Sequence, residues 1–496
     1  MEAKPAIFSS NAYATCAYAA DRQGAGRQRR RFISKKGRTM SASQLRHPIS
    51  RRVFLKGAAG AAGFAAASGF LNGCVAPQAG APAQTEAGGQ QAMTDVYVTT
   101  LAAFADMSMT DTTTIINEEA HKNGINYILE PGADGWETKA LAMVREKQMR
   151  WSANGIANAG NQWNYIQMGL VQPIDELLAT STVPWAQKLA DEYITPSIYE
   201  ATIYEGKTYY VPMKLNIHLM GYRQDFIEAA GYESIPETWD EFEVLLGKLK
   251  ESGAADQVLP FACRKEVFRT LGTAFTTFVE NPYDENNRLR IDSEEWLQCI
   301  KMFKRWFDEG FTNLQVLQDP LPDWQKGKIA IGIDSHSWIR LGRSVWGPEK
   351  VKGVVPPRTD AANPKRTWVH LDSGFVFAEA PHPQEGLDWL LQTLGPEGAA
   401  GDRHWSGTLT FSGMPVHKSQ YEKLIVNSTD FPELIDAYEA LPNSVLQPMP
   451  AGKYYPIIQA KIWPWLERYW GGEVEAETAM ENVIKEVDEE VAKLQA

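Results

Sequence analysis

Three segments of the sequence place a tryptophan beside small polar and charged side chains. They are residues 334–338, 368–372 and 404–407, which read Asp-Ser-His-Ser-Trp, Trp-Val-His-Leu-Asp and His-Trp-Ser-Gly. An indole face beside hydroxyl, amide and carboxylate groups suits a sugar, whose ring has an apolar C–H face and a polar rim. Each of these tryptophans could equally be a core residue, because indole fills apolar space efficiently. The pattern therefore indicates carbohydrate binding or core packing, and the sequence leaves both open.

Motifs for catalysis and for metal binding are absent from the sequence. It contains no H-E-x-x-H, C-x-x-C or G-x-S-x-G motif, and its eight histidines show no close ligand spacing. Gly206-Lys207-Thr208 is similar to the end of a phosphate-binding loop, but the residues after it are strand-like rather than helical. We therefore expect no catalytic residue, no metal and no cofactor, and we predict that the protein is not an enzyme.

Charge is distributed unevenly along the 496 residues. The formal net charge is -12, yet residues 1–74 carry 13 basic and 2 acidic residues, so the rest of the chain carries -23. A nucleic-acid partner requires a basic surface, so this acidic body is expected to bind no nucleic acid. The composition, 44% hydrophobic and 22% charged, is that of a globular protein.

Residues 40–74 have the order of an export signal. Arg51-Arg52 follows a short leader, a weakly apolar stretch rich in Ala and Gly spans residues 57–71, and Cys74 ends the segment. That stretch is shorter than the roughly 20 residues that a membrane-spanning helix needs. The arrangement resembles a twin-arginine signal peptide joined to a lipobox, in which Cys74 is lipidated and becomes the mature N-terminus.

The segments on either side of this signal look irregular. Residues 1–39 are Arg-rich without apolar periodicity, so we expect an extension that is not part of the functional protein; a basic arm that binds nucleic acid is the alternative. Residues 75–93, rich in Ala, Gly, Gln and Pro, predict a flexible tether. The expected location is the cell surface or periplasm, with a lipid anchor. There Cys263 and Cys299 could form a disulfide, or remain two buried free thiols.

From residue 94 onward, strand-like and helix-like segments alternate. Helix 236–250 is well marked, with a Thr238–Glu241 capping box and an i, i+3, i+4, i+7 apolar stripe. Trp239, Trp296, Trp306 and Trp389 lie on helix faces and are expected in the core. Predicted strands cover 96–101, 125–129, 151–156, 329–333 and 375–378; predicted helices cover 112–122, 136–147, 163–168, 236–250, 296–307, 387–394 and 479–494. Such alternation predicts an α/β protein with a parallel sheet covered on both faces.

Several short motifs in the body occur together in one known family. They are Y-E-G-K-T-Y-Y-V-P-M at 204–213, M-G-Y-R-Q-D-F at 220–226, P-E-T-W-D-E at 236–241, G-L-V-Q-P-I at 169–174, G-K-I-A at 327–330 and G-M-P-V at 413–416. Residues 94–496 thus resemble the sugar-binding proteins of ATP-driven (ABC) importers, the class of maltose-binding protein. The resemblance implies a two-lobed, periplasmic-binding-protein-like fold with multiple chain crossovers between lobes. We expect residues 94–216 and 373–412 in lobe 1, and residues 217–372 and 413–496 in lobe 2.

The resemblance also implies where a ligand would bind. The first crossing should supply Asn216 with Lys214 and His218 beside it, and the third crossing His370 and Asp372. The other expected contacts lie in loops that follow predicted strands or in the tryptophan segments: Asn158, Asn161, Trp163, Asp334, His336, Trp338 and Trp405.

The function that the resemblance implies is transport without catalysis. A monomeric lipoprotein would capture a sugar or oligosaccharide in a cleft between the lobes and deliver it to ABC permease subunits in the membrane. Two alternatives remain open from the sequence: a surface-tethered carbohydrate-active enzyme, and a binding protein of the same fold for a non-sugar ligand such as a polyamine or a peptide.

Overall fold

The computed structural model describes residues 93–133, 135–252, 258–411 and 413–495. These residues belong to one compact unit of the chain. The predicted extension, signal, tether residues 75–92 and lipidation site Cys74 lie outside the described residues. No helix in the described part of the chain is long and apolar enough to cross a membrane.

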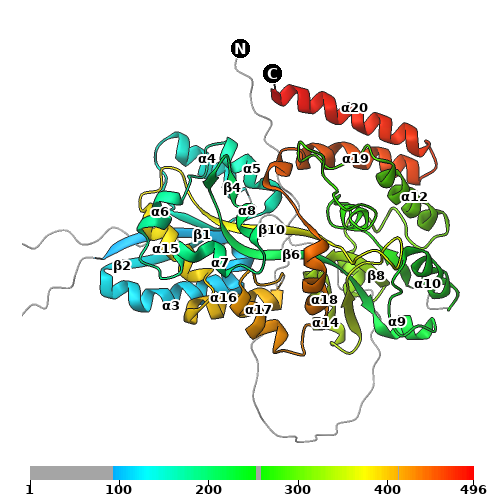
Figure 1. The fold of residues 1–496 in the computed structure, drawn as a ribbon, viewed down its shortest axis with the longest axis horizontal. Helices are drawn as coiled ribbons and strands as arrows, with labels where there is room; N and C mark the ends of the chain where they lie inside the picture. Colours follow the sequence, from blue (N-terminus) through cyan, green and yellow to red (C-terminus); the bar gives the residue numbers. More distant parts are fainter. Residues whose placement is uncertain (1–92, 134, 253–257, 412, 496) are drawn as a thin grey trace, which may run out of the picture. The chain divides into compact units, whose positions relative to one another are not determined.

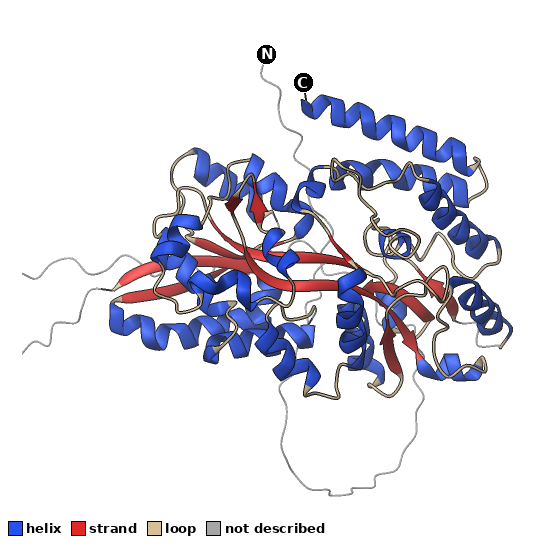
Figure 2. Ribbon diagram, viewed as in Figure 1, coloured by secondary structure: helices blue, strands red, loops and turns tan. Residues whose placement is uncertain are grey.

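A mixed sheet runs through this unit in the order β2-β1-β3-β10-β6-β8-β7, with β9 paired to β6 and β11 to β10. Figures 1 and 2 show its strands passing between the flanking helices. The strands are β1 Thr94–Leu101, β2 Ile125–Gly132, β3 Ala153–Ala157, β6 Val211–Arg223, β7 Leu259–Ala262, β8 Ile329–Ser335, β9 Val351–Val354, β10 Trp368–Val376 and β11 Val445–Leu446; β4 Ile203–Tyr204 and β5 Lys207–Thr208 form a separate hairpin.

The prediction of a parallel sheet is right at the two ends and wrong in the middle. β1 runs parallel to β2 and β3, and β7 runs parallel to β8. β10 is antiparallel to both β3 and β6, and β6 is antiparallel to β8. The two parallel groups are thus joined by strands that carry the chain across in opposite directions.

Helices cover both faces of the sheet, and their predicted positions agree with the structure to within a few residues. Thr238 Oγ1 accepts a hydrogen bond from the Glu241 amide at the start of α10, which confirms the capping box. The main helices are α3 Thr110–Ala120, α4 Trp136–Arg145, α5 Ala159–Gln167, α9 Gln224–Ala229, α10 Trp239–Glu251, α12 Glu294–Asp308, α14 His336–Trp346, α15 Pro383–Thr393, α16 Gly398–Phe411, α18 Pro432–Ala440, α19 Tyr455–Trp470 and α20 Ala476–Gln495. Shorter ones are α2 Ala102–Phe104, α6 Asp175–Thr180, α7 Leu189–Glu192, α8 Pro196–Glu200, α11 Leu271–Phe275, α13 Leu321–Gln325 and α17 Lys418–Tyr421.

Short helical turns of other types link these elements. They are the π-turns η1 Ala105–Met109 and η5 Glu422–Val426, and the 3₁₀ turns η2 His121–Asn123, η3 Ala186–Lys188, η6 Leu441–Asn443 and η7 Met449–Lys453.

Apolar side chains gather in three clusters. The first includes side chains of β1, β3, β6 and β10 and of α15 and α16, a second lies around α10, α12 and α19, and a smaller third lies around α4 and β3. Trp239, Trp296 and Trp306 are core residues of the second cluster and Trp389 of the first, as predicted. Cys263 and Cys299 are free buried thiols in the second cluster, and burial raises the pKa of both, that of Cys263 to about 12.

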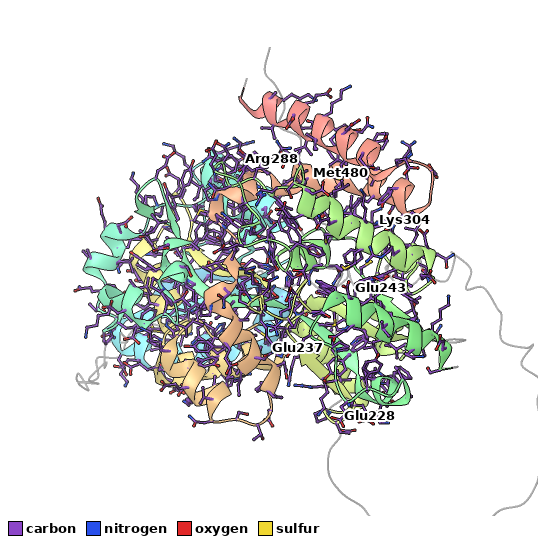
Figure 3. The ribbon with its side chains drawn as sticks, turned by 45° about the vertical axis from the view of Figure 1, so that its right-hand side comes forward. Glu228, Glu237, Glu243, Arg288, Lys304 and Met480 are labelled. Carbon is purple, nitrogen blue, oxygen red and sulfur yellow. The ribbon has the colours of Figure 1, made fainter. Side chains whose placement is uncertain are left out.

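Ion pairs at the surface link helices α10 and α12 above the second cluster. Arg305 Nη2 of α12 lies 2.8 Å from Glu243 Oε2 of α10. Figure 3 shows Glu243 and Lys304 on these two neighbouring helices. Such exposed pairs contribute only about 0–1 kcal/mol each, so this part of the fold is held mainly by the aromatic core beneath them.

Candidate functional site

The long strand β6 has two chemically different faces. All of its 13 residues are buried. Successive side chains of a strand point to opposite faces, so Leu215 and Ile217 lie on one face and join the apolar core. Lys214, Asn216 and His218 lie on the other face. A polar face on a fully buried strand is unusual and requires partners for its charges.

The neighbouring strand β10 completes this polar face. His370 pairs with Asn216, and Asp372 pairs with Lys214 in the antiparallel register, so their side chains share one side of the sheet. Lys214 Nζ lies 3.1 Å from Asp372 Oδ2, and both side chains are almost fully buried. Lys214, Asn216, His218, His370 and Asp372 together form what we call the polar crossing face. The structure therefore brings these five predicted site residues together.

Both histidines of the polar crossing face are neutral. His218 and His370 meet edge to face, with ring centroids 5.1 Å apart. Burial, together with the positive charges of Arg269 and Lys214, lowers the pKa of His370 to about 3. Burial also lowers the pKa of His218 well below its usual value, assisted by His370 and Arg269. His218 Nδ1 lies 3.0 Å from the carbonyl oxygen of Phe268, which can only accept a hydrogen bond.

Asp334 lies beside this face in a second charged group. Arg269 Nη1 donates to Asp334 Oδ1, and Arg264 Nη1 lies 3.1 Å from Asp334 Oδ2. Burial alone would raise the pKa of Asp334, but the two guanidinium groups outweigh it and hold the pKa well below the usual range. Arg269 Nε also lies 2.5 Å from Glu266 Oε2, whose other oxygen accepts a hydrogen bond of 3.0 Å from the Tyr455 hydroxyl.

Sequence reasoning missed Arg264 and Arg269, and the pairing of two strands could have indicated Arg264. β7 and β8 are parallel, with Ala262 opposite Gly332. Arg264 and Asp334, each two residues further along the chain than this pair, therefore lie side by side, and Arg264 reaches Asp334. Recognising β7 as a neighbour of β8 would have predicted this pair.

The loop predicted after the third strand lies at the end of the same sheet. Asn158, Asn161 and Trp163 are half-buried in and before α5. Ala157, which precedes them, pairs with Ser373 of β10, so the loop begins next to the polar crossing face. A Cβ on Gly160 would lie 3.1 Å from the Tyr455 ring, which places the start of α5 directly against Tyr455. Tyr455 is a further residue that the sequence did not suggest.

Three buried acceptor atoms of the polar crossing face have no hydrogen-bond partner among the described residues. They are Asn216 Oδ1, His218 Nε2 and Asp372 Oδ1. Buried polar atoms are nearly always paired in native proteins, and each unpaired one costs about 1–3 kcal/mol. Although two histidines and a carboxylate share this face, no three such side chains in the described part of the chain are arranged to hold a metal ion.

Trp338 does not belong to this site, which corrects its predicted role. It lies in α14 and is only 2% exposed. One side of its indole stacks on Trp324, with ring centroids 4.9 Å apart. The other atoms of the ring pack on Gly221 and Gly332, where an added Cβ would approach Trp338 to 2.6 and 2.7 Å. Its ring is therefore enclosed by protein and cannot support a sugar in this arrangement.

His336 and Trp405 are core residues as well. His336 Nε2 lies 2.9 Å from Glu433 Oε1, and Arg343 binds the same carboxylate through two hydrogen bonds of 2.9 and 2.8 Å. Trp405 is fully buried, and its indole N–H donates to the carbonyl of Gly395 at 2.7 Å. In both cases the polar atoms of these side chains form hydrogen bonds inside the protein.

Comparison with known proteins agrees with this architecture. The model of a family described as bacterial extracellular solute-binding protein matches residues 115–393. A protein of Brucella abortus (strain 2308) described as a binding protein is 21% identical over 314 residues, covering 60% of this chain and 69% of that one. A binding protein of Brucella suis biovar 1 matches over the same shares.

Solved structures show the same fold at low sequence identity. The sugar-binding protein MalE from Xanthomonas citri has a TM-score of 0.65 and 15% identity, covering 81% of this chain and 98% of that chain. An ABC substrate-binding protein from Listeria monocytogenes, solved in complex with cycloalternan, has a TM-score of 0.64 and 14% identity, covering 81% and 99%. The chain therefore belongs to the bacterial extracellular solute-binding protein family and has the two-lobed α/β fold of periplasmic binding proteins.

Proposed function

We propose that this protein captures a sugar or oligosaccharide on the polar crossing face, between its two lobes, and delivers it to an ABC permease. The family supports export and ligand capture, and structural neighbours were solved with cycloalternan, maltotetraose and alpha-D-tagatose. The site on this chain consists of Lys214, Asn216, His218, His370 and Asp372, with Asn158, Asn161, Trp163 and Asp334 at its rim.

The observation that carries this proposal is the charge balance of the site. Lys214 pairs with Asp372. Arg264 and Arg269 pair with Asp334, and Arg269 also binds Glu266. A polyamine would need carboxylates free to bind ammonium groups, and these carboxylates already have cationic partners. A neutral, strongly hydrogen-bonding ligand suits such a site best, and a sugar has that chemistry.

Four of the five residues of the polar crossing face are buried in this conformation and His370 is partly exposed, so we expect the lobes to separate when a ligand enters. Hinge closure on the ligand is the motion that a two-lobed fold with several crossing strands allows. Small-angle scattering should show a smaller radius of gyration with saturating ligand than without it, and an unchanged radius at proven saturation would contradict closure.

The alternative function is that of a carbohydrate-active enzyme. We propose instead that the protein has no catalytic activity. The family and its structural neighbours are binding proteins. Incubation with the glycans that bind should leave them intact when the mixture is analysed by chromatography; release of a product would identify an enzyme.

The test of ligand class is a thermal-shift screen with mono- and oligosaccharides, followed by calorimetric titration. A ligand that binds only the folded state raises the melting temperature. Asn216→Ala should weaken binding about ten- to hundredfold, because a buried hydrogen-bond partner contributes about 1–3 kcal/mol. Asn286, exposed in a distant loop, provides the matched control Asn286→Ala. No melting shift with any sugar would refute the proposal.

We propose that the protein is exported by the twin-arginine pathway and is anchored to the membrane by a lipid on Cys74. Replacing Arg51 and Arg52 by Lys should retain the precursor in the cytoplasm, because that pathway reads the arginine pair. Cys74→Ser should release folded protein from the membrane fraction. Cys74→Ser protein that still sediments with membranes would contradict the lipid anchor.

A further inference from the structure

The three unpaired atoms of the polar crossing face are all hydrogen-bond acceptors. A carboxylate oxygen such as Asp372 Oδ1 and an amide oxygen such as Asn216 Oδ1 can only accept. His218 requires an argument from its tautomer. Its Nδ1 faces the carbonyl oxygen of Phe268 at 3.0 Å, and the Thr273 hydroxyl 3.1 Å away donates its own hydrogen to that carbonyl, so we assign the hydrogen of the ring to Nδ1. Because the ring is buried and neutral, Nε2 then has a lone pair and no hydrogen.

These acceptors lie close together on one side of two paired strands. Asn216 and His218 are two residues apart on β6, and Asp372 is opposite Lys214, two residues from Asn216 on that strand. These three residues are at most 3% exposed. A ligand that enters here must therefore offer several donors within a small area, since each acceptor left unpaired in a closed site costs binding free energy.

The charged side chains around the polar crossing face limit which donor groups a ligand can carry. An ammonium group offers donors, but Lys214 and Arg269 lie beside the histidines and would repel it. A carboxylate or phosphate group would meet the cations, but it offers no hydrogen to three acceptors, one of which belongs to a carboxylate. A hydroxyl group donates one hydrogen and carries no charge. Neighbouring hydroxyl groups offer several hydrogens within a small area without adding a charge.

We infer that the site recognises its ligand through hydrogens donated by free, neighbouring hydroxyl groups, and that it excludes acidic, amino-substituted and O-methylated forms of the same sugar. This inference rests on the proposed function and adds a selection rule to it. His218 becomes a specificity-determining residue, because the Phe268 carbonyl sets which of its nitrogens faces the ligand.

The experiment compares related probes on the unaltered protein. Calorimetric titration uses each parent sugar that shifts the melting temperature, together with its mono-O-methyl ethers, its uronic acid and its 2-amino derivative. We expect at least one methyl ether, the uronic acid and the amino sugar to bind at least about tenfold more weakly than the parent, since each leaves an acceptor unpaired or adds a charge.

Two variants of one residue then test the acceptor directly. His218→Gln keeps an acceptor oxygen near the position of Nε2 and should retain binding to within about tenfold. His218→Phe removes the acceptor and should weaken parent-sugar binding by about tenfold or more, while reducing the discrimination against one methyl ether. Circular dichroism on each variant shows that the protein compared is folded.

The outcomes separate the two proposals. If no sugar binds the unaltered protein, both the proposed function and this rule are wrong. If parent sugars bind but the uronic acid, amino sugar and every methyl ether bind equally well, sugar capture stands and the selection rule is overturned.

Discussion

Replacing Trp338 by Ala distinguishes packing from recognition at the residue where sequence and structure differ most. The indole is enclosed between Trp324 and the backbone of two strands, and it is 2% exposed. Removing a buried Trp typically lowers the free energy of unfolding by about 3–5 kcal/mol, because the lost contacts leave a cavity. In a body of this size that corresponds to a fall in melting temperature of roughly 4–6 °C. Val345→Ala, on the exposed side of the same helix, should change stability by less than about 0.5 kcal/mol.

A double-mutant cycle with Gly332 makes this prediction specific to the contact. A Cβ at Gly332 would lie 2.7 Å from Trp338 Cζ2, so Gly332→Ala should destabilise the protein by about 1–3 kcal/mol through overpacking. In the Trp338→Ala background that clash is absent. The double variant should therefore be more stable than the sum of the single effects predicts, by about 1 kcal/mol or more.

Chemical denaturation of the four proteins gives these free energies, and titration with a sugar that binds gives the affinity of each folded variant. We expect Trp338→Ala to bind normally once folded. A Trp338→Ala variant that melts like the unaltered protein but has lost sugar binding would show that Trp338 contacts the ligand. If the changes in the free energy of unfolding are strictly additive in the cycle, the Trp338–Gly332 contact does not account for the loss of stability.

Acidification and loss of a buried charge should each destabilise the fold in a defined way. Burial lowers the pKa of His404 to about 3 and that of His417 to about 4, so below pH 6.5 the unfolded chain binds protons that the folded protein does not. The free energy of unfolding should thus fall by about 2 kcal/mol per histidine between pH 7 and pH 5, and a melting temperature that is constant over this range would contradict it. Glu433→Ala should cost about 3–5 kcal/mol, measured by urea unfolding, because it leaves Arg343 buried without its carboxylate. Asp430→Ala, exposed one turn away, should have little effect, and equal losses in both variants would refute this account.

The sequence was a good guide to elements whose signal is local. The capping box at Thr238 and the apolar stripe after it predicted α10 because both depend on residues three or four positions apart. The strand of residues 375–378 was recognised only at its apolar end. β10 begins at Trp368, and its first half contains His370 and Asp372, which resemble loop residues until β6 is placed beside them.

Residues of the candidate site were predictable where a family motif precedes the strand that crosses between the lobes. They were not predictable where the residue with which they interact is distant in the sequence. Lys214 and Asn216 follow such a motif. Arg269 follows none, and its role depends on Asp334, which β8 brings to the same sheet edge. Trp338 was misjudged for a related reason: its polar neighbours suggested a ligand, whereas the glycines that make room for its ring, such as Gly221, lie on strands far away in the sequence.

The contrast between the two faces of β6 is itself an argument for function. On one side, Leu215 and Ile217 join a continuous apolar core. On the other, the same strand buries Lys214 against Asp372 and leaves the Asn216 oxygen unpaired. Replacing a buried ion pair by apolar side chains is often neutral or stabilising, so stability alone does not explain a polar face that ordinary packing could have avoided. The free-energy cost of this polar face is explained if a bound ligand donates hydrogen bonds to its unpaired acceptors. We therefore assign ligand binding to this face.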